Sequence, residues 1–221
     1  MDRIPEPELM EREEQAKAYS EADFSTPHQM FVDLFSDKFG PDLAGTVLDL
    51  GCGPADITVR FAKAYPSCSL HGVDGSKAML KYAQKRIEKE HLSGRIVLIH
   101  CLIPHCRLPC EQYHALIANS LLHHLPAPNA LWKTIERYAA PNAPVFVMDL
   151  IRPYSKKEAK KLVDKYSGDE PQILKDDFYN SLLAAYTVDE VKDQLKAINL
   201  DCLKVEKVTD RHMVIYGEIM P

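Results

Sequence analysis

A short apolar run that ends at two glycines is the segment best suited to chemistry. Val47 to Leu50 is typical of a buried strand, and it leads through Gly51-Cys52-Gly53 into the start of a helical pattern. Glycines at such a turn let the backbone bend sharply and let a ligand approach the main chain, while the first turn of the helix offers unpaired N–H groups. The segment predicts a ligand site at a strand-to-helix turn.

An acidic residue at the end of the next apolar run narrows the choice of ligand. Asp74 lies 23 residues after Gly51, where a carboxylate at the end of a second strand can accept both hydroxyl groups of a ribose. This spacing predicts an adenosine-type ligand. The alternative is that the glycines only shape a tight turn and that Asp74 caps the next helix. A nicotinamide dinucleotide is disfavoured, because Asp56 stands at the third position of the glycine pattern and would face the pyrophosphate.

The elements that position these residues follow from the spacing of apolar residues. Five short apolar runs, with helical segments among them, favour a mostly parallel, doubly wound sheet. Two further runs can pair as an antiparallel hairpin at its edge. We therefore expect an α/β fold with a seven-stranded Rossmann-like sheet. The strands are expected at 47–50, 70–73, 96–99, 115–118, 144–149, 203–208 and 213–219, and the helices between them at 55–65, 76–87 and 129–139.

The remaining segments are expected to cover the sheet. The stretch 8–21 is charged with few apolar anchors, which suits a surface helix or lid, and a second helix is expected to end near Gly40. Residues 154–186 are rich in Lys, Asp and Tyr and are expected to form a helical insert, and Thr187 with Glu190 predicts a capping box. We expect one domain over 1–221, with an N-terminal helical cap (1–40), a cofactor-binding core (46–152), an insert or lid (154–186) and a closing helix and hairpin (187–221).

Charge and composition exclude several classes of protein. Lys and Arg total 27 against 32 Asp and Glu, a net charge of −5, so no basic excess attracts a phosphate backbone and no nucleic-acid partner is expected. Residues 1–14 are acidic where a signal peptide needs a positive flank, and no apolar run approaches ~18 residues. We therefore expect a cytoplasmic protein without a membrane partner, whose six cysteines are free thiols.

Three segments resemble one family. Asp49-Leu50-Gly51-Cys52-Gly53 is similar to the first motif of the class I S-adenosylmethionine-dependent methyltransferases, and the segment 73–79 resembles their second motif. The segment 118–125 resembles the fourth-strand segment of the ubiquinone-type and small-molecule branch. The resemblance covers 46–152 closely and the closing hairpin loosely. It implies methyl transfer to a small-molecule acceptor, with the acceptor O, N, S or C atom left open.

The resemblance also implies how the cofactor would be held. Asp49 and Gly51 would flank its methionine part, Asp74 would bind the ribose hydroxyls, and Met79 would lie against the adenine. Asn119 would contact the amino-acid end through its backbone. The full set of residues expected to hold S-adenosylmethionine is Asp49, Gly51, Cys52, Gly53, Asp74, Gly75, Met79, Leu102, Ile103 and Asn119.

Two positions depart from the family pattern. Ala55 stands where the family often has a third glycine, which a ligand without a pyrophosphate tolerates. Leu102 stands where many relatives have an acid that binds the adenine amino group. The adenine would then be held by backbone groups and by apolar contact with Leu102 and Ile103.

Methyl transfer from a sulfonium is an in-line displacement that requires an aligned and dry site. In relatives a tyrosine of the N-terminal helix closes over the sulfonium, and Tyr19 is the matching residue; the alternative is a surface tyrosine that packs one helix. His123 is the first candidate for a base that takes the acceptor's proton. The alternative is that His123 and its neighbour only shape their loop. The residues expected to contact the acceptor are His28, His124, Arg152, Tyr179 and Tyr186.

Further alternatives concern metal binding and turnover. The segment 100–110 carries two histidines and three cysteines but no Cys-x-x-Cys pair, so no metal is expected. A non-catalytic protein that binds S-adenosylmethionine as a sensor or partner subunit is the alternative to an enzyme. The expected assembly is a monomer or homodimer.

Overall fold

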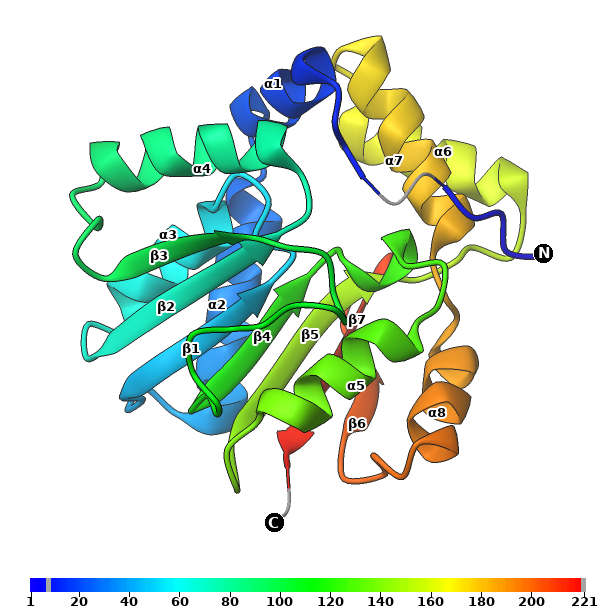
Figure 1. Cartoon of the computed structure of the whole chain (residues 1–221). Helices are drawn as coiled ribbons and strands as arrows, with labels where there is room; N and C mark the ends of the chain where they lie inside the picture. Colours follow the sequence, from blue (N-terminus) through cyan, green and yellow to red (C-terminus); the bar gives the residue numbers. More distant parts are fainter. Residues whose placement is uncertain (7–8, 220–221) are drawn as a thin grey trace.

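A mixed sheet of seven strands crosses the part of the chain that the computed structural model describes, residues 1–6 and 9–219 (Figure 1). The strand order is β3-β2-β1-β4-β5-β7-β6. Strands β1 to β5 are parallel, whereas β7 is antiparallel to both β5 and β6. The predicted fold class and its C-terminal hairpin are thus confirmed. The strands are β1 Gly45–Leu50, β2 Cys68–Asp74, β3 Ile96–His100, β4 Ala115–Asn119, β5 Pro144–Leu150, β6 Lys204–Lys207 and β7 His212–Glu218.

The order of the strands determines where a ligand can bind. The chain runs outward from β1 through β2 to β3 and then returns to the other side of β1 with β4. In doubly wound sheets the crevice for a ligand opens at this reversal, outside the carboxyl ends of the strands. The glycine turn follows β1 directly, so the fold places it at that crevice.

Eight α-helices lie in the described residues, and their caps explain several of the boundaries. Ser76 Oγ accepts a hydrogen bond from Met79 N at 3.2 Å and begins α4. The predicted capping box of Thr187 and Glu190 is present at α8. The helix predicted from residue 8 begins at Glu13, and Glu8 itself lies outside the described residues. The helices are α1 Glu13–Glu21, α2 Ser25–Phe39, α3 Asp56–Ala64, α4 Lys77–Lys89, α5 Asn129–Tyr138, α6 Lys156–Ser167, α7 Gln172–Ala184 and α8 Val188–Ala197.

Apolar side chains bury both faces of the sheet. On one face, Phe35 of α2 packs edge-on against Phe61 of α3 and Phe146 of β5. On the other face, the fully buried Trp132 of α5 belongs to one cluster with Val191 of α8. These two apolar layers hold the strand ends that form the crevice.

Three helices and the N-terminal segment cover the carboxyl ends of the strands. Helix α1 contacts α7, and α7 packs on α6, beyond one end of the sheet (Figure 1). The N-terminal segment joins this cover, because Ile4 N donates to Leu183 O at 3.0 Å and Arg3 Nη2 donates to His123 O at 2.8 Å. The guanidinium of Arg3 also lies 4.2 Å from the ring centre of Tyr186. The segments predicted as an N-terminal cap and a helical insert therefore contact each other and together form the cover.

Arg152 holds parts of this cover together, and its guanidinium is bound by groups of the chain itself. Its guanidinium donates to Met1 O and Ala185 O, each at 3.0 Å, and to Glu190 Oε1 at 2.6 Å. The side chain is buried. This position gives no support to the prediction that Arg152 contacts the acceptor, because three partners from distant parts of the chain bind its guanidinium.

Replacing Arg152 with Ala should therefore destabilise the fold by about 2 to 4 kcal/mol, because two backbone carbonyls and a carboxylate lose a charged donor. Urea unfolding of Arg152→Ala and of a control, Arg137→Ala on the exposed face of α5, measures the difference. Equal stability of the two variants would contradict the fastening role.

Candidate active site

One cavity opens at the predicted crevice and is called here the cofactor cavity. It lies beyond the carboxyl ends of β1, β2 and β4 and is also bordered by Tyr19 and His28 from the cover. Ten residues were expected to hold a cofactor, and all ten line it: Asp49, Gly51, Cys52, Gly53, Asp74, Gly75, Met79, Leu102, Ile103 and Asn119.

The glycine turn is hydrogen-bonded to the end of β2. Gly51 N and Cys52 N both donate to Val73 O, at 2.8 and 3.0 Å. Gly51 has φ 71°, and a Cβ atom there would lie 2.8 Å from a methyl group of Leu121. A Cβ atom at Gly53 would meet no heavy atom of the described residues within 4 Å. The backbone at Gly53 is therefore open to the cavity, as close approach of a ligand requires.

Both oxygens of the Asp74 carboxylate are oriented by backbone groups. Oδ2 accepts from Gly53 N at 2.8 Å and Oδ1 accepts from Ser76 N at 2.7 Å. Burial raises the pKa of Asp74, although these two hydrogen bonds oppose the increase. The interaction with Ser76 is the capping role considered as an alternative, yet each oxygen retains a second lone pair. The carboxylate can therefore cap α4 and still accept ribose hydroxyls.

Asp49 also lines the cofactor cavity. Thr58 Oγ1 donates to its Oδ2 at 2.6 Å, and the residue is 2% exposed. Burial raises the pKa of Asp49 to about 7. A carboxyl group in this state can ionise when a cationic ligand is bound beside it.

Asn119 ends β4 with an acceptor that lacks a partner. Its Nδ2 donates to Ser120 Oγ at 3.2 Å, whereas the buried Oδ1 has no hydrogen-bond partner among the described residues. Buried acceptors are rarely left unsatisfied. Asn119 also lines the cofactor cavity, so a ligand donor is the natural partner for this oxygen.

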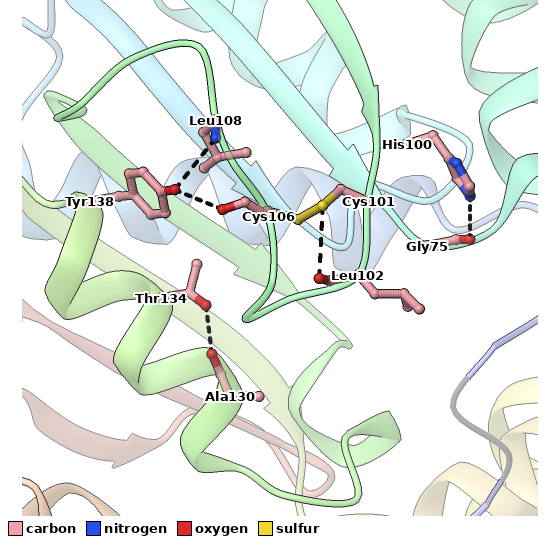
Figure 2. The surroundings of a disulfide bond; sticks show 9 residues. All are labelled: Gly75, His100, Cys101, Leu102, Cys106, Leu108, Ala130, Thr134 and Tyr138. Atoms are coloured by element: carbon pink, nitrogen blue, oxygen red, sulfur yellow. Dashed lines mark hydrogen bonds between the residues drawn. A yellow bond between two sulfur atoms is a disulfide. The ribbon is translucent and has the colours of Figure 1, made fainter.

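The loop after β3 lines the cofactor cavity where the adenine is expected. It carries Leu102 and Ile103, and Leu102 is 45% exposed. Cys101 and Cys106 form a disulfide with Cα atoms 5.6 Å apart, and Tyr138 Oη donates to Cys106 O at 2.8 Å (Figure 2). The expectation of free thiols is corrected at these two positions, because the loop turns back within five residues and brings the cysteines together.

A second cavity, called here the acceptor cavity, lies between the sheet and the covering helices. It is lined from α1, α2, α6 and α7, and by His123, Met148 and His212. Six residues border both cavities and define the junction between them: Met10, Tyr19, His28, Asn119, Ser120 and His124.

Tyr19 and His28 enter the junction from the cover. The Tyr19 ring packs on Phe24 with ring centres 4.8 Å apart. Burial, followed by the nearby carboxylates, raises the pKa of Tyr19 to about 12, so the phenol remains neutral. His28 Nδ1 lies 2.7 Å from Asp56 Oδ2, and Asp56 also binds the guanidinium groups of Arg60 and Arg86. This network fixes the orientation of His28.

His123 contacts two carboxylates that sequence reasoning missed. Its Nδ1 lies 2.6 Å from Asp149 Oδ1, and its Nε2 lies 3.5 Å from Glu6 Oε1. Burial alone would lower the pKa of His123, but the charges of Asp149 and Glu6 outweigh it and raise this pKa. Asp149 is the next-to-last residue of the apolar strand β5, a position that could have marked it. Glu6 is distant in sequence and carries no such signal.

Two predicted acceptor contacts are not brought to the site. Tyr179 packs at the edge of the apolar cluster between α6 and α7, and Tyr186 Oη donates to Leu125 O at 3.4 Å. Neither is among the described residues that line the two cavities. They help to build the cover, which is why aromatic residues occur in the insert.

Comparison with known proteins agrees with this geometry. Residues 47–142 match the family described as methyltransferase domain. A SAM-dependent methyltransferase from Aquifex aeolicus superposes with a TM-score of 0.69 at 18% identity, covering 93% of this chain and 98% of that chain. The chain has the class I S-adenosylmethionine-dependent methyltransferase fold. The family resemblance seen in the sequence is thereby confirmed for its methyltransferase domain.

Other methyltransferases are similar to this chain in fold or in part of their sequence. The plantazolicin methyltransferase BpumL, solved in complex with a monoazolic desmethylPZN analog and SAH, has a TM-score of 0.72 at 15% identity over 94% of this chain and 90% of that chain. Malonyl-[acyl-carrier protein] O-methyltransferase of Priestia megaterium is 28% identical over 54% of this chain and 40% of its own length. Demethylmenaquinone methyltransferase of Lactobacillus johnsonii is 28% identical over 48% of this chain and 44% of its own length. The chain thus spans less than half the length of these two curated relatives.

None of the helices in residues 1–6 and 9–219 is long and apolar enough to cross a membrane.

The buried Asp49 makes stability depend on pH. Because its folded-state pKa of about 7 lies above the ordinary value near 3.8, the protonated carboxyl favours the folded state. This contribution is complete below the ordinary value and is lost as the pH rises through about 7. Between pH 5 and pH 8 the protein should therefore lose about 2 kcal/mol relative to Asp49→Asn. Urea unfolding at both pH values measures this, and parallel pH profiles would contradict it.

Proposed function

We propose that this protein transfers the methyl group of S-adenosylmethionine to a small-molecule acceptor held in the acceptor cavity. One observation carries the proposal: every residue expected to hold the cofactor lines one cavity, and that cavity meets a second one at a defined junction. A protein that only binds the cofactor has no need of the second cavity. The sensor or partner-subunit alternative is therefore less well supported.

The residues of the cofactor cavity fit S-adenosylmethionine by their chemistry. Asp74 offers oriented oxygens for two ribose hydroxyls, the backbone at Gly53 is open to close approach, and Asn119 Oδ1 offers an unsatisfied acceptor to the amino group. Asp49 offers a carboxyl group that can ionise beside a cation. When bound, the cofactor supplies an activated methyl group on a positively charged sulfur.

The chain's own contribution to the transfer is orientation and exclusion of water. An in-line displacement needs the acceptor atom, the methyl carbon and the sulfur in one line. The junction lies between the two cavities, so a line from an acceptor atom in one cavity to the cofactor sulfur in the other would pass through it. Tyr19 and Met10 border it from the cover, and a neutral phenol ring can lie against a sulfonium without a competing charge.

The experiment that tests this function uses calorimetric titration with S-adenosylmethionine, S-adenosylhomocysteine and NADH. Both adenosyl ligands should bind with one site per chain, and NADH should not. A chain that binds should then transfer labelled methyl from S-adenosylmethionine to compounds in a small-molecule acceptor panel. Binding of NADH alone would overturn the proposal, and saturable cofactor binding without transfer to any acceptor would favour the sensor alternative.

Asp74→Ala should weaken the binding of S-adenosylhomocysteine about 10- to 100-fold, because a charge-assisted, two-oxygen contact is lost. Calorimetry on the variant measures the affinity, and its melting temperature shows whether the turn still folds. Asp193→Ala, on the exposed face of α8, is the matched control. Unchanged affinity in a folded Asp74→Ala variant would show that the ribose is held elsewhere.

Tyr19→Ala should weaken the binding of S-adenosylmethionine about 2- to 10-fold more than that of S-adenosylhomocysteine, because only the former carries a sulfonium to lie against the ring. Tyr19→Phe retains the ring and should change the two affinities little. An equal loss for both ligands in Tyr19→Ala would mean that the ring contacts another part of the cofactor.

A further inference from the structure

We propose that Glu6, His123 and His124 form a binding site for a divalent transition-metal ion at the wall of the acceptor cavity. Among residues 1–6 and 9–219, these are the three metal-ligating side chains whose ligand atoms come within 4.8 Å of one another. They come from two places, the N-terminal segment and the 3₁₀ turn η1 (Leu122–His124) after β4. The two histidines line the acceptor cavity.

The spacing of the donor atoms suits a shared ion better than direct ion pairs. Glu6 Oε1 lies 3.5 Å from His123 Nε2 and 3.3 Å from His124 Nδ1. Charge-assisted hydrogen bonds between such groups are usually about 2.7 to 2.9 Å long, and the contact between His123 and Asp149 is 2.6 Å. Nitrogen and oxygen ligands at about 2.0 to 2.2 Å from a tetrahedral ion lie about 3.3 to 3.5 Å apart.

Hydrogen bonds from neighbouring residues orient two of the three ligand side chains, as is usual at metal sites. Asp149 Oδ1 accepts from His123 Nδ1, which leaves the lone pair of Nε2 facing Glu6. Asp149 is itself held, because Oδ2 accepts from Leu122 N at 2.8 Å. A carboxylate bound to the far nitrogen of a ligating histidine fixes its tautomer and raises its basicity. Ser181 Oγ donates to Glu6 Oε1 at 3.0 Å and orients the third ligand.

The N-terminal segment is fastened to the turn that carries the histidines. Arg3 donates to His123 O and to Leu125 O, at 2.8 and 3.3 Å. Glu6 therefore reaches the histidines on a segment tied to their own backbone. Two carboxylates, Glu6 and Asp149, balance the charge of a divalent ion in a region where His123 is almost fully buried.

The donor set indicates the class of ion. Two imidazoles and one carboxylate suit Zn²⁺, Fe²⁺, Co²⁺ or Ni²⁺ rather than Mg²⁺ or Ca²⁺, which prefer oxygen ligands. Three protein ligands leave a position for a ligand from the cavity, as catalytic sites do. The sequence analysis examined the segment 100–110 and predicted no metal. The site proposed here differs from that prediction and lies elsewhere in the chain.

The role of the ion rests on the proposed function. An acceptor hydroxyl bound at the open position would lose its proton to solvent more readily. The acceptor oxygen would then bond to the methyl carbon while the carbon–sulfur bond breaks, which leaves neutral S-adenosylhomocysteine. His123 would serve as a ligand in this reaction, in place of the base role expected from the sequence.

The test is metal binding by the full, tag-free chain after treatment with a chelator. Calorimetry with Zn²⁺ should show one site per chain, with no comparable binding of Mg²⁺. Glu6→Gln and His124→Gln should each weaken Zn²⁺ binding at least tenfold, whereas the exposed controls Glu14→Gln and His105→Gln should not. Absence of saturable Zn²⁺ binding, or unchanged binding in both Glu6→Gln and His124→Gln, would overturn the site.

Two further measurements distinguish metal binding at this site from metal binding to cysteines and from the proposed methyl transfer. Co²⁺ bound here should show ligand-field bands without thiolate charge-transfer bands; the latter would assign the metal to cysteines and overturn the proposal. Titration with S-adenosylhomocysteine on the same samples tests the proposed function independently. A chain that binds S-adenosylhomocysteine but not Zn²⁺ overturns the metal site alone, and one that binds Zn²⁺ but not S-adenosylhomocysteine retains the site and loses the methyltransferase role.

Discussion

The arrangement of both cavities depends on the way the ends of β1 and β2 hold each other. The carbonyl of Val73 accepts from the first two residues of the glycine turn, and the carboxylate of Asp74 accepts from Gly53 N and Ser76 N. These four hydrogen bonds fix the turn after β1 and the start of α4 in one geometry. Neighbouring parallel strands end at the same edge of a sheet, so the clamp has only a short distance to bridge. Without it, neither the open backbone at Gly53 nor the start of α4 would have a defined position.

A second set of contacts fastens the cover over this edge. Arg3 and Arg152 both donate to backbone carbonyls, and together they join the N-terminal segment, the η1 turn, the end of α7 and the start of α8. Guanidinium groups suit this work because they offer several donors in a fixed plane. The cover over the acceptor cavity is thus held by these polar contacts as well as by the apolar cluster between α6 and α7.

The sequence predicts the local features of this protein well. The strands, the capping box at Thr187 and the ligand turn with Asp74 follow from short-range signals: alternation of apolar runs, turn chemistry and the spacing from Gly51 to Asp74. The other cofactor-cavity residues were predicted through the family resemblance. Contacts between distant residues carry no such signal. Arg152 was expected at the acceptor because it follows a strand, but its donors are used by Met1, Ala185 and Glu190. Glu6 contacts a histidine about half the chain length away, His123, and the pairing of Cys101 with Cys106 depends on how one loop turns back.

The fastening of the N-terminal segment also dictates an order of events during folding. Arg3 contacts Ala184, 181 residues later in the chain, and His123, 120 residues later. Arg3 is therefore synthesised before both of its partners, and it can meet Ala184 only after α7 has left the ribosome. Contacts of such high sequence separation form late, since the loop between them must close before they contribute. Strands β1 to β5 and the glycine turn thus leave the ribosome before the cover can close over their carboxyl ends.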